Sequence, residues 1–186
     1  MAQQFEEISP RLGEFIARQP MFFVATAARD GRVNVSPKGY ESLRVLGPNR
    51  VVWLNLTGSG NETAGHLLDS PRMTLMFCSF QRQPLILRLY GTARAVHRRD
   101  PDWADLAGLF PPDVGARTVF DVTVEMVQTS CGYAVPLMTL DGERDLLRTW
   151  SAKKGEDGIV DYWRDKNQST IDGAPTGLPI EPRSGR

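Results

Sequence analysis

The sequence has little cysteine, little histidine and no excess of charge of either sign. Cys78 and Cys131 are its only cysteines, and His66 and His97 are its only histidines, among 186 residues. Such a chain cannot build a disulfide framework, and its histidines have no neighbouring ligands at metal-site spacing. Basic and acidic residues number 22 each, so no net field favours nucleic acid or an anionic membrane. We therefore expect no metal site, no nucleic-acid partner and no membrane partner.

Long apolar runs are also missing. The N-terminal stretch MAQQFEEISP lacks the basic and apolar regions of a signal peptide, and no apolar run is long enough to span a bilayer. These features predict a cytoplasmic protein with reduced thiols. A length of 186 residues is near that of one domain and is enough to bury a core. We expect one domain over 1–186, with its core at about 15–136 and a C-terminal helical extension at 141–173.

What the sequence does contain is about six short segments rich in β-forming residues. They predict strands at 21–27, around 33–35, and at 51–54, 73–79, 85–96 and 118–127. Arg29-Asp30-Gly31, between the first two, is typical of a tight hairpin. In the segment 85–96, large residues on one face give way to Gly91, Ala93 and Ala95. A face of small residues permits tight curvature or the close approach of another body.

Short helices are predicted before, between and after these strands. Ser9-Pro10 supplies a cap and a first-turn proline for a helix that ends near Arg18. Other helices are predicted at 61–68, at 101–109 with Asp100 as its cap, at 146–155 and at 159–166, with a loop or frayed tail from Asp172. This order lacks the βαβ alternation of a parallel sheet. It predicts a mainly β fold, an antiparallel barrel with helices at both ends.

The most informative run is Thr57-Gly58-Ser59-Gly60-Asn61-Glu62-Thr63, between a strand and a helix. Its glycines let the backbone turn sharply, its hydroxyls and amide can donate, and the first N–H groups of the helix point the same way. That combination suits a phosphate. Glu62 opposes it, because a carboxylate repels a phosphate, although it can complement the dipole of its own helix. The alternative is a plain strand–turn–helix connection.

A second run, Ser36-Pro37-Lys38-Gly39-Tyr40, closes the second predicted strand. Lys38 can neutralise a phosphate and Ser36 can donate a hydrogen bond to it. The alternative is a solvated lysine in a turn.

The third run, from Gln128 to Pro136, is expected to leave the last strand abruptly. Gln128, Ser130 and Tyr133 can hydrogen-bond to the edge of a heterocycle, and Tyr133 can also stack on one. Cys131 has no histidine near it in the sequence, which favours an inert or packing role over a nucleophilic one.

These three runs, with PRMTLMFCSF and RLYGTARAV between them, resemble the pyridoxamine 5′-phosphate oxidase-like family of FMN-binding split barrels. The resemblance extends from about Phe15 to Gly173, and the stretch after Trp150 resembles one branch of that family. It implies an antiparallel split β-barrel whose homodimer holds two FMN molecules at its interface. By this resemblance, Lys38 and the run from Thr57 to Thr63 hold the phosphate. Residues 128–133 then lie near the flavin ring of their own or of the partner subunit.

The sequence departs from the family's oxidase in three places. Val33 stands where the oxidase has an arginine, and neutral residues with Glu62 replace an Arg-Lys pair in the phosphate turn. The tail TGLPIEPRSGR lacks the arginine and histidine that grip the phosphate of the substrate. We therefore expect a substrate other than pyridoxamine phosphate. The loss of basic residues also leaves room for weak FMN binding or for another cofactor, such as the deazaflavin F420.

The function predicted by this resemblance is that of an FMN-dependent oxidoreductase acting on an unidentified small molecule or electron donor. No side chain stands out as a general acid or base, which fits a reaction centred on its cofactor. The alternatives are a non-catalytic carrier or sensor of flavin or haem, an F420-dependent reductase, and a structural dimer without a cofactor site.

Overall fold

The computed structural model describes residues 2–180, which form eight strands and four helices. The strands are β1 (Gln3–Phe5), β2 (Phe22–Thr26), β3 (Asn34–Lys38), β4 (Leu43–Gly47), β5 (Arg50–Leu56), β6 (Arg72–Cys78), β7 (Ile86–His97) and β8 (Ala116–Ser130). The helices are α1 (Pro10–Ala17), α2 (Glu62–Asp69), α3 (Trp103–Ala107) and α4 (Leu146–Lys166).

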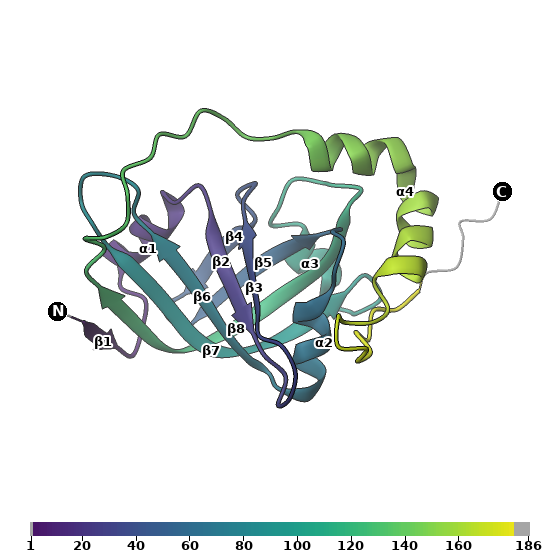
Figure 1. Ribbon diagram of the computed structural model, residues 1–186, viewed down its shortest axis with the longest axis horizontal. Helices are drawn as coiled ribbons and strands as arrows, with labels where there is room; N and C mark the ends of the chain where they lie inside the picture. Colours follow the sequence, from purple (N-terminus) through teal and green to yellow (C-terminus); the bar gives the residue numbers. More distant parts are fainter. Residues whose placement is uncertain (1, 181–186) are drawn as a thin grey trace.

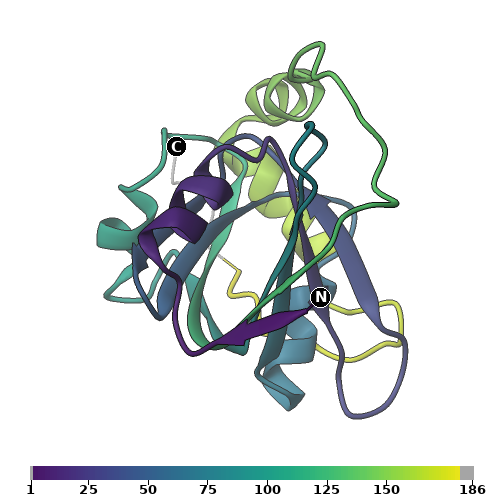
Figure 2. The ribbon, with the colours of Figure 1, turned by 90° about the vertical axis from the view of Figure 1, so that its left-hand side faces the viewer.

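All the strand pairs are antiparallel, and the sheet curls into a split barrel (Figures 1 and 2). The strand order is β3-β2-β6-β7-β8-β5-β4, and β1 pairs with β8 outside this path. β3 and β4 are therefore the two edges of the path. The curl matters for function, because it brings β3 opposite β5, which lies five places away in the strand order.

The first helix forms as its sequence predicts. The Ser9 hydroxyl accepts the Leu12 N–H at 3.4 Å, and Pro10 occupies the first helical position, where its missing N–H costs nothing. Leu12, Phe15 and Ile16 then fall on one face and are buried in the main core. This packing fastens α1 to the barrel.

Two apolar clusters divide the barrel between them. The larger contains Trp53, which stacks on Phe120 with ring centroids 4.5 Å apart, and the smaller lies under α3. β7 contributes Leu89 and Ala93 to the first cluster and Val96 to the second, because odd- and even-numbered residues of a strand lie on opposite faces. Its pairing with β8 shifts register between Tyr90 and Gly91. A Cβ on Gly91 would lie 1.9 Å from the Thr123 carbonyl oxygen. Of the two alternatives that this small-residue face left open, a close approach is found at Gly91, and the approaching segment is the paired strand β8.

Several predicted boundaries were wrong. β1 and β4 were not predicted, so the sheet has eight strands where about six were expected. The β2–β3 hairpin has a loop over 27–33 in place of a tight turn, although Gly31 does adopt a positive φ of 99°. Asp100 does not cap α3, because its carboxylate accepts the His97 N–H at 2.8 Å and ends β7 instead. The residue before α3 is Asp102.

The C-terminal part breaks where its glycine predicts. Gly155 has non-helical angles (φ 65°, ψ 176°) inside α4, which separates two helical pieces at the expected place. The second piece buries Ile159, Val160 and Trp163 in a third apolar cluster with Leu178. Residues 172–180 are thus a loop packed against α4, and the end of the predicted tail, 181–186, lies outside the described residues. None of the helices in residues 2–180 is both long and apolar enough to cross a membrane.

Candidate anion-binding site

The edge strand β3 turns its polar side chains inward and its apolar side chains outward. Asn34, Ser36 and Lys38 pair across the ladder with Thr26, Val24 and Phe22, which are buried. Val33 and Val35, on the other face, are 70% and 60% exposed. This is the reverse of the usual arrangement of a strand on a core. Such a reversal indicates that the inner polar face and the outer apolar face serve something other than packing.

The inner face of β3 borders a pocket of about 300 Å³. The opposite walls come from β5, from the turn that precedes α2, and from the first residues of β8. The lining residues are Asn34, Ser36, Lys38, Asn55, Leu56, Gly58, Ser59, Gly60, Asn61, Glu62, Thr63 and Arg117. The structure thus brings together the first and second of the predicted runs.

Two cations face this pocket, Arg117 buried and Lys38 half-buried. Lys38 lies with its Nζ 5.4 Å from the Trp53 ring centroid, and burial, with the charge of Arg117, lowers the pKa of the lysine from 10.5 to about 8. Arg117 is 2% exposed, and burial lowers its pKa to about 10, so it stays charged at neutral pH. Neither cation has a carboxylate partner anywhere in residues 2–180.

Buried charges are normally paired, so two unpaired cations in one pocket call for an anion. The hydrogen-bond inventory points the same way. Arg117 Nε and Asn61 Oδ1 are buried without a partner among the described residues. One is a donor and the other an acceptor. A ligand that fits must therefore present an anionic group beside Arg117 and a hydroxyl or N–H beside Asn61.

The turn before α2 supplies uncharged donors. α2 begins at Glu62, and Asn61 makes no side-chain cap, so the first N–H groups of the helix are left for the pocket. The Glu62 carboxylate, the feature that opposed a phosphate, accepts the Ile171 N–H on both oxygens at 3.1 Å. Thr57 lies below the turn, where its hydroxyl donates to the Gly115 carbonyl and accepts from Trp163 Nε1, both at 2.8 Å. Thr57 therefore holds the turn in place.

The third predicted run is separated from this pocket. β8 continues to Ser130, so the expectation that the chain leaves the strand after residue 127 was wrong. Tyr90 donates to the Gln128 side chain at 3.3 Å, and Arg88 donates to the Ser130 hydroxyl at 3.1 Å. Cys131 and Tyr133 are exposed, the tyrosine at 83%.

The strand pairing measures this separation. Pro37 pairs with Phe23, Phe23 with Met76, Met76 with Arg88, and Arg88 with Gln128. Four steps of about 4.8 Å separate Gln128 from Pro37 by roughly 19 Å along the curved sheet. Within one chain, the first two runs meet and the third does not join them.

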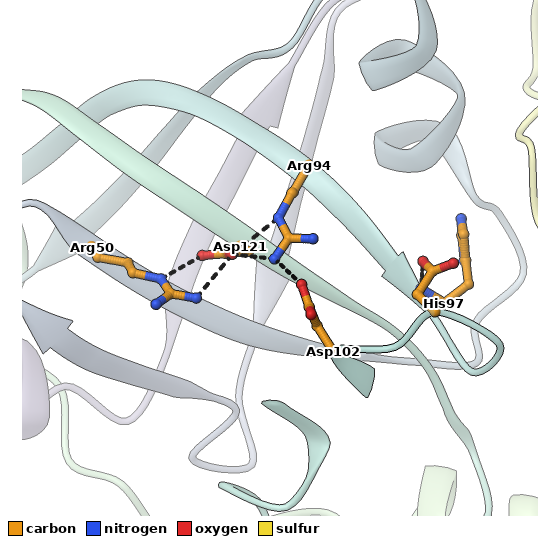
Figure 3. Close-up of polar contacts among 6 residues, drawn as sticks. Arg50, Arg94, His97, Asp102 and Asp121 are labelled. Atoms are coloured by element: carbon orange, nitrogen blue, oxygen red, sulfur yellow. Dashed lines mark hydrogen bonds and ion pairs between the residues drawn. The ribbon is translucent and has the colours of Figure 1, made fainter. Parts of the chain in front are cut away.

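In a second charged cluster, unlike in the pocket, the cations are paired with carboxylates (Figure 3). Arg50 and Arg94 both point at Asp121, with N–O distances of 2.9 to 3.1 Å, and Arg94 also donates to Asp102 at 2.7 Å. Burial raises the pKa of Asp121, but the hydrogen bonds and charges of the two arginines outweigh it, so the pKa lies below its usual value. These exposed arginines are satisfied and leave no anion site. Residues 2–180 also contain no cluster of three potential metal ligands.

Sequence reasoning missed Arg117, the most deeply buried cation of the pocket. β5 and β8 pair Leu56 with Ala116 and Asn55 with Thr118, and this register carries the Arg117 side chain to the turn. Its one signal in the sequence was a charged residue at the start of the apolar strand ARTVFDV. Asn34 and Asn55 also line the pocket and were not predicted.

The fold and the site together define a class of protein: a split barrel with a candidate anion pocket between an edge strand and the N-terminus of a helix. The family model described as pyridoxamine 5′-phosphate oxidase matches residues 8–131. The family protein ustO of Aspergillus flavus is 36% identical over 191 residues, covering 92% of this chain and 76% of ustO. The chain therefore belongs to the pyridoxamine 5′-phosphate oxidase family.

Solved structures agree on the fold. A candidate pyridoxamine 5′-phosphate oxidase of Lactobacillus delbrueckii has a TM-score of 0.54 and 18% identity, over 66% of this chain and 94% of that one. HupZ of Group A Streptococcus has a TM-score of 0.51 and 21% identity, over 66% of this chain and 99% of HupZ. At these identities the likeness concerns the fold, and the predicted split barrel is confirmed.

Proposed function

We propose that this protein is an FMN-dependent oxidoreductase and that its pocket holds the phosphate of the cofactor. The observation that carries the proposal is the pair of cations without carboxylate partners, half-buried Lys38 and buried Arg117, beside the N-terminus of α2. A phosphate monoester supplies the anion that these cations lack, and the ribityl chain of FMN supplies hydroxyls that can donate to Asn61 Oδ1. Ser36, Ser59 and Thr63 add hydroxyl donors to the same pocket.

The groove next to the pocket is large enough to accept a flavin ring. It has a volume of about 540 Å³ and shares Asn34, Ser59, Gly60 and Glu62 with the anion pocket. Its apolar walls are Val33, Val35 and Ile171, whose side chains are exposed. A flat aromatic ring on this surface would cover them, with its phosphate end in the adjoining pocket. Both spaces lie within the usual size range of small-molecule sites.

A homodimer completes the proposed site. The outer face of the sheet carries Phe23, Met76, Tyr90 and Met126, which are only partly buried, in continuity with Val35. Residues 131–145 carry further exposed apolar side chains, those of Tyr133, Leu137, Met138 and Leu140. A second copy packed on this face would carry its own Gln128 and Ser130 across the 19 Å separation estimated from strand spacing. We propose that these residues reach the flavin ring from the partner subunit.

The flavin, when bound, supplies the hydride or electron transfer, and the protein's own residues bind, orient and shield it. Lys38 and Arg117 fix the phosphate end, and β3 fixes the edge along which the ring lies. The substrate is a small molecule other than pyridoxamine phosphate, because Val33 and Glu62 stand where the oxidase has basic residues. Cys78 and Cys131 are both free thiols, which fits the cytoplasmic location that we propose.

The visible spectrum of the purified protein, before and after addition of FMN and desalting, tests this proposal. Retained flavin bands, followed by turnover with NADH or NADPH, support the oxidoreductase. Retained flavin without turnover supports the carrier or sensor. Absence of retained flavin refutes the FMN assignment, and titrations with F420 and haem then separate the remaining alternatives from a barrel without a cofactor. Light scattering tests the dimer, since a monomer at micromolar concentration contradicts a site shared by two subunits.

A further inference from the structure

The segment that follows α4 lies behind the anion pocket and makes hydrogen bonds to three of its lining residues, Gly58, Asn61 and Arg117. Asn167, the first residue after the helix, is fully buried. In the sequence it lies about 50 residues after Arg117, the residue of β8 that lines the pocket. Figure 1 shows this C-terminal segment, in yellow, returning from α4 to lie beside α2. The contacts of Asn167 explain why an amide is buried at this place.

One end of the Asn167 side chain orients Arg117. Its Oδ1 accepts a hydrogen bond from the guanidinium of Arg117 at 2.5 Å. Among residues 2–180 this is the one hydrogen-bond partner of a guanidinium with five donors, and Nε has no partner there. An amide oxygen fixes the direction of the guanidinium without neutralising its charge. The remaining donors stay available to a ligand.

The other end of Asn167 holds the turn. Its Nδ2 donates to the Gly58 carbonyl at 3.1 Å, and its backbone carbonyl accepts from Thr176 Oγ1 at 2.6 Å and from Asn61 Nδ2 at 3.4 Å. Asn167 thereby links the guanidinium, the glycine-rich turn and the residue before α2. An aspartate could not make the same set, because it has no donor for Gly58 and would form an ion pair with Arg117.

We propose that Asn167 is the positioning residue of the anion site, holding Arg117 charged and aimed at a bound phosphate. The C-terminal segment is then part of the binding site of this chain. This inference rests on the proposed function for the identity of the ligand, a phosphate monoester, but its geometry concerns any anion of that class. It assigns to the segment after α4 a role that the barrel alone does not fill.

The test compares Asn167→Ala and Asn167→Asp with Gln168→Ala. Gln168 is the matched control, because its side chain donates to the Trp163 carbonyl at 3.1 Å, whereas the hydrogen bond to Arg117 is made by Asn167. Affinity for inorganic phosphate is measured by calorimetry and affinity for FMN by flavin fluorescence. We expect Asn167→Asp to weaken both at least tenfold, Asn167→Ala to weaken both severalfold, and Gln168→Ala to change neither by more than twofold.

Repeating the Asn167 substitutions in an Arg117→Met protein separates the positioning of Arg117 from general support of the fold. In Arg117→Met, Asn167→Ala should weaken the residual phosphate affinity clearly less than it does in the wild type, because the hydrogen bond to Arg117 is already gone and only the contacts with the turn remain to be lost. Equal losses in the two backgrounds overturn the proposal. Failure of every Asn167 variant to fold, judged by circular dichroism, also overturns it in favour of a structural role.

The two ligands keep this inference distinct from the proposed function. A wild-type protein that binds phosphate but not FMN, with the expected cycle, upholds Asn167 and refutes the flavin assignment. A wild-type protein that binds neither overturns both.

Discussion

Replacing Lys38 with methionine should stabilise the ligand-free protein while abolishing its anion binding. Lys38 is a half-buried charge without a carboxylate partner, so nothing in the ligand-free protein offsets its desolvation and its repulsion by Arg117. Its pKa falls from 10.5 to about 8, a difference that corresponds to about 3 kcal/mol of destabilisation at neutral pH. The lost contact with the Trp53 ring offsets about 1 kcal/mol of the gain. We expect a net stabilisation of about 2 kcal/mol.

Thermal unfolding in a buffer without phosphate is the assay. For a chain of this length, about 2 kcal/mol corresponds to a rise in Tm of roughly 4–8 °C. Saturating phosphate or FMN should raise the Tm of the wild type and leave that of Lys38→Met nearly unchanged, because only the wild type gains from binding. Lys153→Met, which removes an exposed lysine on α4, is the control and should alter neither Tm nor ligand response.

The sign of the pH dependence follows from the same shift. Between about pH 8 and 10.5 the unfolded chain holds a proton on Lys38 that the folded chain has lost, so stability contributed by this residue rises with pH. Phosphate affinity has the opposite trend and falls above about pH 8, as the free site loses its charge. A Lys38→Met protein that is less stable than the wild type and still responds to phosphate would refute the reasoning.

Three further perturbations test other parts of the structure. Glu62→Gln should raise phosphate affinity by a factor of about five in low salt, measured by calorimetry, since it removes a nearby negative charge worth up to about 1 kcal/mol. Asn61→Asp should weaken FMN at least tenfold in fluorescence titrations without loss of fold, because it adds a charge beside the phosphate. Gly91→Ala should lower stability to denaturant by about 2–4 kcal/mol, because its Cβ would overlap the backbone of β8. Gly13→Ala, where a Cβ meets nothing within 4 Å, should be neutral or stabilising.

Much of the barrel could be predicted, because most of its strands have a clear signal in their own local sequence. The segments that became β2, β5, β6 and β7 are rich in buried, β-branched or aromatic residues, and turn residues separate them. β1 could not be predicted, since its three residues are exposed and it exists through pairing with β8. β4 was missed for a similar reason, because none of its five residues is fully buried.

The residues of the candidate site also fall into two groups, those with a local sequence signal and those defined by long-range contacts. Lys38 and the turn before α2 were predicted because each lies in a run whose residue types already suit a phosphate. Arg117 and Asn167 could not be found in this way, since their roles depend on contacts between segments 50 residues apart. The expected loop at Gln128 failed because the ladder with β7 and β1 extends β8 by three residues beyond its last apolar position.

The outward-facing apolar residues of β3 affect how readily the protein aggregates. An edge strand with bare valines and free backbone groups is a template on which another strand can add, and natural proteins usually blunt such edges. Here Pro37 blunts one end of the strand, while Val33 and Val35 leave the other end open. A cofactor and a partner subunit would cover this stretch. In cells that lack this cofactor, the protein should therefore accumulate as aggregates. Expression of the same gene in flavin-rich cells should yield soluble protein.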